Sequence, residues 1–142
     1  MIHDIKQNFL TPEVYEIYSQ CMYAPTYGKF AEKASAYLNS KSTAVYGYYE
    51  NTALLGVIVL QAKSPNTAEI VGIAVEHTRQ HRHIGKKLIQ HTAALGHYAE
   101  LYAETDDDAV TFYKQCGFEV EAFQAVYDGI PCKRYRCTCH LS

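Results

Sequence analysis

Residues 69–90, EIVGIAVEHTRQHRHIGKKLIQ, place an apolar run directly before a basic turn and a helical pattern, and this order constrains the fold more than any other stretch. The run 69–76 is rich in Ile and Val and too short for a typical helix, so it predicts a buried strand. After Gly85 the apolar residues recur at helical spacing until Gly96, which predicts a helix over 85–95. We therefore expect a strand, a turn and a helix in immediate succession.

The turn between this strand and this helix has the composition of an anion site. It is rich in Arg and His, and Gly85, Lys86 and Lys87 follow it at the start of the helix. The first backbone N–H groups of a helix lack internal partners, and the macrodipole is positive there. Glycine also lets a phosphate approach the backbone closely. The sequence therefore predicts a phosphate or diphosphate site at this turn.

Composition narrows the classes of protein that the chain can belong to. A length of 142 residues with 48% hydrophobic content predicts one domain, 1–142, with a sizeable core. The net charge is -2, and the basic residues concentrate at 79–87, which disfavours a nucleic-acid or membrane binder. No apolar stretch approaches the roughly 20 residues that span a bilayer, and the N-terminus lacks a signal pattern. We expect a cytoplasmic protein with reduced cysteines, since five is an odd number.

The remaining elements follow from caps, periodicity and turn residues. Thr11 and Pro12 are typical of a helix start, Gly117 of a helix end, and Asp128-Gly129 of a hairpin turn. Helices are expected at 12–22, 29–38, 85–95 and 107–116. Strands are expected at 42–50, 53–62, 69–76, 99–104, 118–127 and 132–140.

Two motifs then carry a family resemblance. Residues 80–85 read Gln-His-Arg-His-Ile-Gly, and 109–118 read Ala-Val-Thr-Phe-Tyr-Lys-Gln-Cys-Gly-Phe. Together with Val75 and Leu88 they resemble the GNAT superfamily of acyl-CoA-dependent N-acyltransferases, and the expected element order agrees over nearly the whole chain. The acyl-CoA loop of that family reads Arg/Gln-x-x-Gly-x-Gly/Ala. Its fourth helix commonly ends in an aliphatic or aromatic residue, Tyr, two or three variable residues and Gly-Phe, which this chain matches fully.

The resemblance implies a fold and a set of cofactor contacts. The implied fold is α/β, with a mixed, mostly antiparallel central sheet of about six to seven strands flanked by about four helices. The backbone of Ile73, Ala74 and Val75 would bond the pantetheine arm of acetyl-CoA as an added strand. Asp106 lies where many relatives have Asn near the cofactor arm. The diphosphate would lie on the backbone N–H groups of Gln80, His81, Arg82, His83, Ile84, Gly85 and Lys86.

His83 stands where the first glycine of the family's loop is usual. Its side chain either narrows the diphosphate site or adds a contact of its own. Because backbone N–H groups do most of the phosphate binding, we expect the site to survive this change.

The resemblance also implies the catalytic groups of an N-acetyltransferase. An alkylamine with a pKa near 10.4 is neutral in only about one molecule in a few thousand at pH 7, so a base or a water relay is expected. Glu69 lies where the histone-acetylating branch of the family places its catalytic glutamate. Tyr113 would protonate the departing thiolate. The ordinary alternatives are a strand-start acid for Glu69 and a core tyrosine for Tyr113.

The acceptor is less defined than the cofactor. Tyr23 and Tyr27 lie between the first two expected helices, the segment that shapes the acceptor pocket in this family. If they line it, an amine with an apolar or cationic part would suit their aromatic faces. A small-molecule or peptide amine is expected, and the resemblance also allows a homodimer through an edge strand. A non-catalytic acyl-CoA-binding or regulatory module is the alternative function, ahead of a nucleic-acid-binding module.

No metal is expected. His77, His81 and His83 lie on a turn without a carboxylate or cysteine set. Cys132, Cys137, Cys139 and His140 are near one another in sequence, but 137 and 139 fall on one face of an expected strand, where cysteine is a good buried residue.

Overall fold

The computed structural model describes residues 1–78 and 83–141. In chain order the elements are β1 (Ile2–Asp4), η1 (Lys6–Asn8), α1 (Pro12–Tyr18), η2 (Ser19–Cys21), α2 (Tyr27–Asn39), β2 (Thr43–Glu50), β3 (Ala53–Ser64), β4 (Thr67–Val75), α3 (Ile84–Ala94), β5 (Glu100–Thr105), α4 (Val110–Gln115), β6 (Glu119–Tyr127) and β7 (Ile130–His140). Within the described ranges, none of the helices is both long and apolar enough to cross a membrane.

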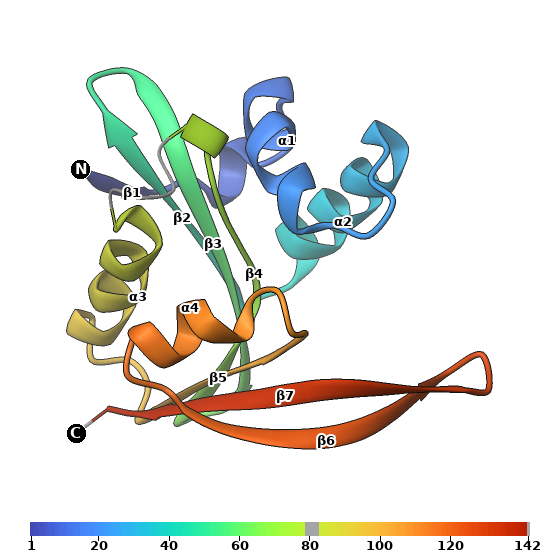
Figure 1. The fold of residues 1–142 in the computed structure, drawn as a ribbon. Helices are drawn as coiled ribbons and strands as arrows, with labels where there is room; N and C mark the ends of the chain where they lie inside the picture. The colour runs from blue at the N-terminus through green and yellow to red at the C-terminus, as the bar shows by residue number, and fades with distance from the viewer. Residues whose placement is uncertain (79–82, 142) are drawn as a thin grey trace.

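The strands form one sheet in the order β1-β2-β3-β4-β5-β7-β6. Every neighbouring pair is antiparallel except β4 and β5, which run parallel. The expected α/β fold, with a mixed and mostly antiparallel sheet, is confirmed. The hairpin of β6 and β7 projects beyond the body of the molecule at one end of the sheet (Figure 1).

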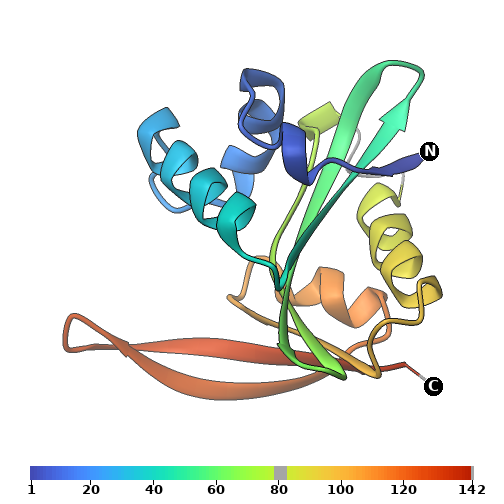
Figure 2. The ribbon, with the colours of Figure 1, turned by 180° about the vertical axis from the view of Figure 1, so that it is seen from behind.

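Helices cover both faces of the sheet, and each face has its own hydrophobic core (Figure 2). On one face, Ile84 and Leu88 of α3 and Tyr113 of α4 pack against the strands. On the other face, Tyr18 of α1 and Phe30 of α2 are the largest buried side chains. The central strands therefore carry apolar side chains on both faces, which explains why β3 is an almost continuous apolar run.

The main differences from the sequence-based expectations concern β1, the end of α1 and the start of α4, while several other boundaries shift by one or two residues. The short edge strand β1 was not expected, because three residues carry too little alternation to be recognised. Helix α1 ends at Tyr18 and continues as the 3-10 turn η2, so the expected helix 12–22 is too long. Helix α4 begins at Val110, because Asp106 Oδ1 accepts hydrogen bonds from the N–H groups of Asp108 and Ala109 and holds these residues in a turn.

Strands β4 and β5 pair over a short distance only and then separate. Their register joins Thr67–Glu69 to Glu100–Tyr102, and no later residue of β4 pairs with β5 in the described chain. Strand β4 also has a bulge, since Leu60 of β3 lies opposite Ile70 and Val59 lies opposite Gly72, which leaves Val71 unpaired. The bulge reverses which residues face each core, so Ile70 faces α3 and α4 whereas Ala74 faces α1 and α2.

Gly72, directly after the bulge, lets α1 approach the sheet. A β-carbon at this position would lie 2.0 Å from the Tyr18 hydroxyl oxygen, whose ring is buried. Tyr18 also shares a 3.1 Å hydrogen bond with the Tyr37 hydroxyl, so it cannot move away freely.

We predict that Gly72→Ala lowers the free energy of unfolding by about 1–3 kcal/mol, the usual effect of overpacking a core. Urea denaturation measures the change. Gly28→Ala is the matched control, because a β-carbon there would meet only the Thr26 hydroxyl at 3.9 Å and alanine suits a helix. Equal midpoints for Gly72→Ala and the wild type would contradict this account of the packing.

Candidate active site

The separation of β4 from β5 opens a cleft of about 1230 Å³. One wall is the strand edge 70–75, and the opposite wall comes from α4 and the turn before it. The start of α3 closes one end, and η2, the end of β5 and Arg134 of β7 surround the other. The cleft therefore extends from the N-terminus of α3 to residues of η2, β5 and β7.

The α3 end of the cleft contains the expected diphosphate contacts that the structure describes. His83, Gly85 and Lys86 line it, whereas Ile84 is buried in the core beside α3. The first N–H groups of a helix generally lack intrahelical partners, which is why a helix start of this kind commonly binds an anion. Gln80, His81 and Arg82 lie outside the described residues, so the structure gives no position for these three predicted contacts.

His83 and Gly85 have different roles at this helix start. His83 is the N-cap of α3 and has φ 58° and ψ 26°, the left-handed conformation that glycine adopts most easily. Histidine therefore occupies a glycine-type backbone position without changing the path of the chain. At Gly85 a β-carbon would lie 2.9 Å from two ring atoms of Phe112, so here the absence of a side chain is needed for α3 to pack against α4.

The edge of β4 supplies main-chain groups to the middle of the cleft. Ile73, Ala74 and Val75, the expected pantetheine contacts, all line it. Because β5 has already separated, this edge faces the cleft instead of another strand. An extended pantetheine arm is the kind of group that can add to such an edge through main-chain hydrogen bonds.

Cys21 of η2 lies beside this edge and was not predicted from the sequence. Its thiol donates a hydrogen bond to the Tyr18 carbonyl oxygen at 3.2 Å and lies close to the Ile73 backbone N–H. The residue is open to the cleft, but its sulfur is largely surrounded by protein, and this burial raises the pKa of the thiol to about 11. Cys21 is therefore a neutral thiol at pH 7 and a poor nucleophile.

Tyr113 of α4 faces the cleft from the opposite wall. Its side chain is 5% exposed and packs against Phe112 and Phe118, with ring centroids 5.1 Å and 5.3 Å away. Burial is the main reason that the pKa of Tyr113 is raised well above its ordinary value of 10, with neighbouring thiols adding to the shift. The phenol therefore keeps its proton throughout the neutral and mildly alkaline range.

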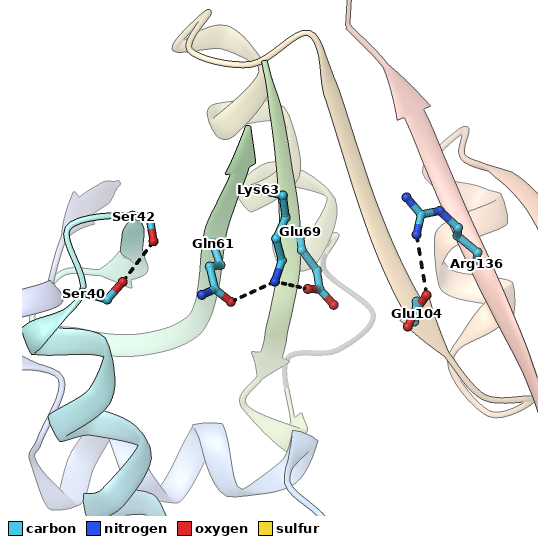
Figure 3. A network of polar contacts seen from close by, with 7 residues as sticks. All are labelled: Ser40, Ser42, Gln61, Lys63, Glu69, Glu104 and Arg136. Carbon is cyan, nitrogen blue, oxygen red and sulfur yellow. Dashed lines mark hydrogen bonds and ion pairs between the residues drawn. The ribbon is translucent and has the colours of Figure 1, made fainter. Parts of the chain in front are cut away.

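Glu69 lies outside the set of residues that line the cleft. It belongs to the last pair that joins β4 to β5, opposite Tyr102. Its carboxylate forms a 3.4 Å ion pair with Lys63 Nζ, which also donates to the Gln61 side chain (Figure 3). The Glu69 side chain is 22% exposed, so it is partly accessible to solvent where the two strands separate.

The other predicted contacts divide between the cleft and the rest of the molecule. Asp106 lines the cleft, and its Oδ1 accepts from the two N–H groups that precede α4. Tyr23 lines the cleft and is 95% exposed. Tyr27 does not line it, since it is the first residue of α2 and packs edge-on against Tyr15, 5.2 Å between ring centroids.

Three charged residues of the cleft, Glu104, Asp108 and Arg134, were not predicted as site residues. Glu104 follows a buried alanine in β5, and Arg134 lies on a neighbouring strand. A polar residue that alternates with buried ones suggests an exposed sheet face, but the sequence does not show that this face borders a cleft. As for metals, residues 1–78 and 83–141 contain no group of three His, Cys, Asp or Glu side chains that could hold an ion.

Comparison with known proteins identifies the family. A family model described as an acetyltransferase (GNAT) domain matches residues 17–139. None of the curated proteins compared with the chain matches it significantly.

Three solved structures show the same fold. An IAA acetyltransferase from Bacillus cereus is 24% identical, with a TM-score of 0.68 and 99% of each chain covered. A GNAT family acetyltransferase from Elizabethkingia anophelis with acetyl-CoA bound is 23% identical, with a TM-score of 0.71, covering 99% of this chain and 97% of that one. The ribosomal-protein-S18-alanine N-acetyltransferase from Escherichia coli is 17% identical, with a TM-score of 0.75 and 100% and 94% covered. The chain therefore belongs to the GNAT acetyltransferase family, and it is an acyltransferase.

Proposed function

We propose that this protein transfers the acetyl group of acetyl-CoA to a primary amine by direct attack. One observation carries the proposal: a single cleft is lined by the N-terminus of α3, by Tyr113 and by the part of β4 that extends beyond its pairing with β5. An acetyl-CoA whose diphosphate lies on the helix start and whose pantetheine follows this edge would bring its thioester toward Tyr113. The acetyl-CoA bound to the Elizabethkingia anophelis enzyme supports this cofactor for the same fold.

The reaction needs one proton removed and one proton supplied. The neutral amine attacks the thioester carbonyl carbon, and the carbonyl π electrons move to oxygen. When this intermediate collapses, the C–S bond breaks and the CoA sulfur takes the phenol proton of Tyr113. The proton released by the acetylated nitrogen passes to a base. The N–H groups at the start of α3, together with Lys86, would also balance the charge of the cofactor.

Cofactor binding should depend on Gly85 far more than on the residue at 83. We predict that His83→Gly keeps the acetyl-CoA dissociation constant within a few-fold, because glycine adopts the same left-handed backbone without strain. Gly85→Ala should weaken binding by roughly 10-fold or more, because its β-carbon displaces Phe112 from the cleft wall. Isothermal titration calorimetry with acetyl-CoA measures both. If His83→Gly weakened acetyl-CoA binding more than Gly85→Ala did, the start of α3 would not be the diphosphate site.

Two observations support a role for Tyr113 as general acid: its phenol stays protonated, and its side chain faces the cleft. We predict that Tyr113→Phe lowers kcat by roughly 10²–10⁴-fold, the usual contribution of a positioned proton donor, with little change in acetyl-CoA affinity. Release of CoA thiol across a panel of amines measures turnover. Tyr127→Phe is the matched control, since Tyr127 is exposed at the hairpin and does not line the cleft.

The same assay tests the whole proposal. Acetyl-CoA binding without thiol release for any amine would favour a non-catalytic acyl-CoA-binding module instead. If Tyr113→Phe transferred the acetyl group with an unchanged kcat, the general-acid role of Tyr113 would fail, but the proposed acetyl transfer would stand.

Glu69, directly or through water, is the proposed base. A water relay fits its position, because the Glu69 side chain is partly solvent-accessible at the point of strand separation but does not itself line the cleft. We predict that Glu69→Gln lowers kcat by roughly 10²–10⁴-fold and that alkaline pH partly restores the rate, since the amine then loses its proton without help. Rate profiles from pH 6 to 10 measure this.

Lys63→Gln distinguishes a base from an ion-pair role. It breaks the same ion pair but leaves the carboxylate, so it should reduce kcat far less than Glu69→Gln. Equal losses in the two variants would show that the pair matters only for structure. If Glu69→Gln did not lower kcat, the base would instead be a water relay that does not involve Glu69.

The acceptor is proposed as a small-molecule or peptide amine. The cleft is open at its η2 and β7 end, where Tyr23 offers an exposed aromatic ring. The Escherichia coli enzyme of the same fold acts, by its name, on an alanine of ribosomal protein S18, which supports including peptide N-termini among the amines assayed.

A further inference from the structure

Arg134 supplies a cation to the end of the cleft that is remote from α3. It lies on β7, two residues before Arg136, whose partner on β5 is Glu104. The neighbouring Tyr135 pairs with Thr105, the last residue of β5, so Arg134 lies just beyond the end of that strand. Odd-numbered residues here, such as Cys137, face the core beside α4, which places Arg134 on the opposite face, where the cleft opens.

Few of the hydrogen-bond donors of Arg134 are used. A guanidinium carries five N–H donors. Arg134 Nη2 donates to the Glu104 backbone oxygen at 3.3 Å, while its Nε is buried and has no hydrogen-bond partner within the part of the chain that the structure describes. No carboxylate among these residues forms an ion pair with it within 4.0 Å. Burying an N–H without a partner is unfavourable, so a ligand that completes its hydrogen bonds would be held here.

Arg136 shows what a satisfied arginine looks like on the same strand. Its guanidinium forms a 3.6 Å ion pair with Glu104 (Figure 3). It also stacks over the Tyr102 ring, 3.9 Å from the centroid. Arg136 does not line the cleft. Only Arg134, of these two neighbours, combines unused donors with a position at the cleft, which distinguishes a binding residue from a sheet-stabilising one.

The acids around Arg134 narrow the kind of ligand. Glu104, Asp106 and Asp108 also line the cleft, and Glu104 already has Arg136 as a partner. Their combined negative charge favours the ammonium form of an approaching amine and disfavours a dianion such as a phosphate. A planar carboxylate carries one negative charge and matches the guanidinium fork. The carboxylates of the cleft and the Arg134 guanidinium together suit a molecule with an amine and a carboxylate.

We propose that Arg134 binds the carboxylate of the acceptor, and that the substrate class of this enzyme is therefore amines that carry a carboxylate, such as amino acids. The inference rests on the proposed acetyl transfer and specifies its acceptor. Arg134 is a specificity-determining residue in this scheme, because its contact selects and orients the acceptor while Tyr113 acts on the thioester.

The test compares acceptors that differ only in the carboxylate. The probes are α-, β- and γ-amino acids, each beside its carboxamide, and kcat/KM is measured by CoA release. The wild type should prefer the carboxylate over the amide for at least one spacing. Arg134→Gln should reduce that preference by roughly 10- to 100-fold, the effect of losing hydrogen bonds to a charged group. Because each ratio is compared between two proteins, differences in the acceptors' own amine pKa cancel.

Two variants control for charge and geometry. Arg134→Lys keeps the charge but loses the fork, so it should lie between the wild type and Arg134→Gln. Lys133→Gln removes one positive charge from the same strand without touching the cleft lining, and it should leave the preference unchanged. The proposal is overturned if acetyl transfer shows the same carboxylate-to-carboxamide ratio of kcat/KM in the wild type and in Arg134→Gln. It is also overturned if the only preference for an anionic acceptor is for O-phosphoethanolamine over ethanolamine.

A binding experiment separates this inference from the proposed function. N-acetyl amino acids carry the carboxylate without needing turnover, and their N-acetyl amides lack it. With CoA present, the acids should raise the melting temperature of the wild type more than the amides do, and Arg134→Gln should abolish the difference. If no amine is acetylated but this difference is found, the proposed function fails and the carboxylate site stands. If the acids and amides give equal shifts in the wild type, the carboxylate site fails.

Discussion

The incomplete pairing of β4 with β5 is the constraint on which the rest of the structure depends. Three residue pairs hold the two strands in parallel, and then they separate. A strand edge that has lost its partner still needs hydrogen bonds for its N–H and C=O groups. In an ordinary sheet this would be a weakness, but here the edge faces a cleft into which an extended ligand can fit. The separation thus creates both the space for a cofactor and part of the hydrogen bonding that holds it.

The bulge at Val71 and the two hydrophobic cores make this separation stable. Since the bulge changes which side chains face each core, β4 contributes to the packing of α3 and α4 at its start and to that of α1 at its end. Gly72 then allows the buried Tyr18 to lie directly against the strand. The helices on the two faces therefore pack against one strand. This packing fixes the positions of the α3 start and of Tyr113 across the cleft.

The electrostatics of the cleft differ from end to end. The α3 end offers backbone N–H groups and Lys86, which suit the diphosphate of a cofactor. The middle is nearly neutral, because burial keeps the Tyr113 phenol and the Cys21 thiol protonated. The β7 end mixes acids with Arg134, whose donors are largely unused. In the proposed reaction, the cofactor and an acceptor that carries both an amine and a carboxylate would therefore approach Tyr113 from opposite ends of the cleft.

Local sequence patterns predicted most of the elements, because periodicity, caps and turn residues act over a few neighbouring positions. They also predicted the family. Most of the residues proposed to contact the cofactor on β4 and at the start of α3 line one cleft, since a strand followed closely by a glycine-containing helix start brings these groups together along the chain. His83 shows the limit of a motif, because it adopts the left-handed backbone conformation that glycine favours although its side chain departs from the motif.

Only the tertiary structure decided which distant residues share the cleft. Glu69 is in the strand that lines it but turns toward Lys63, whereas Tyr27 packs against Tyr15 and Tyr23 faces the opening. Cys21, Glu104 and Arg134 come from three separate elements and carry no local signal of a site. Their placement depends on where two strands stop pairing and on how a bulge turns side chains from one face to the other. Those are properties of contacts between segments far apart in sequence, so the sequence determined the parts and the packing determined the site.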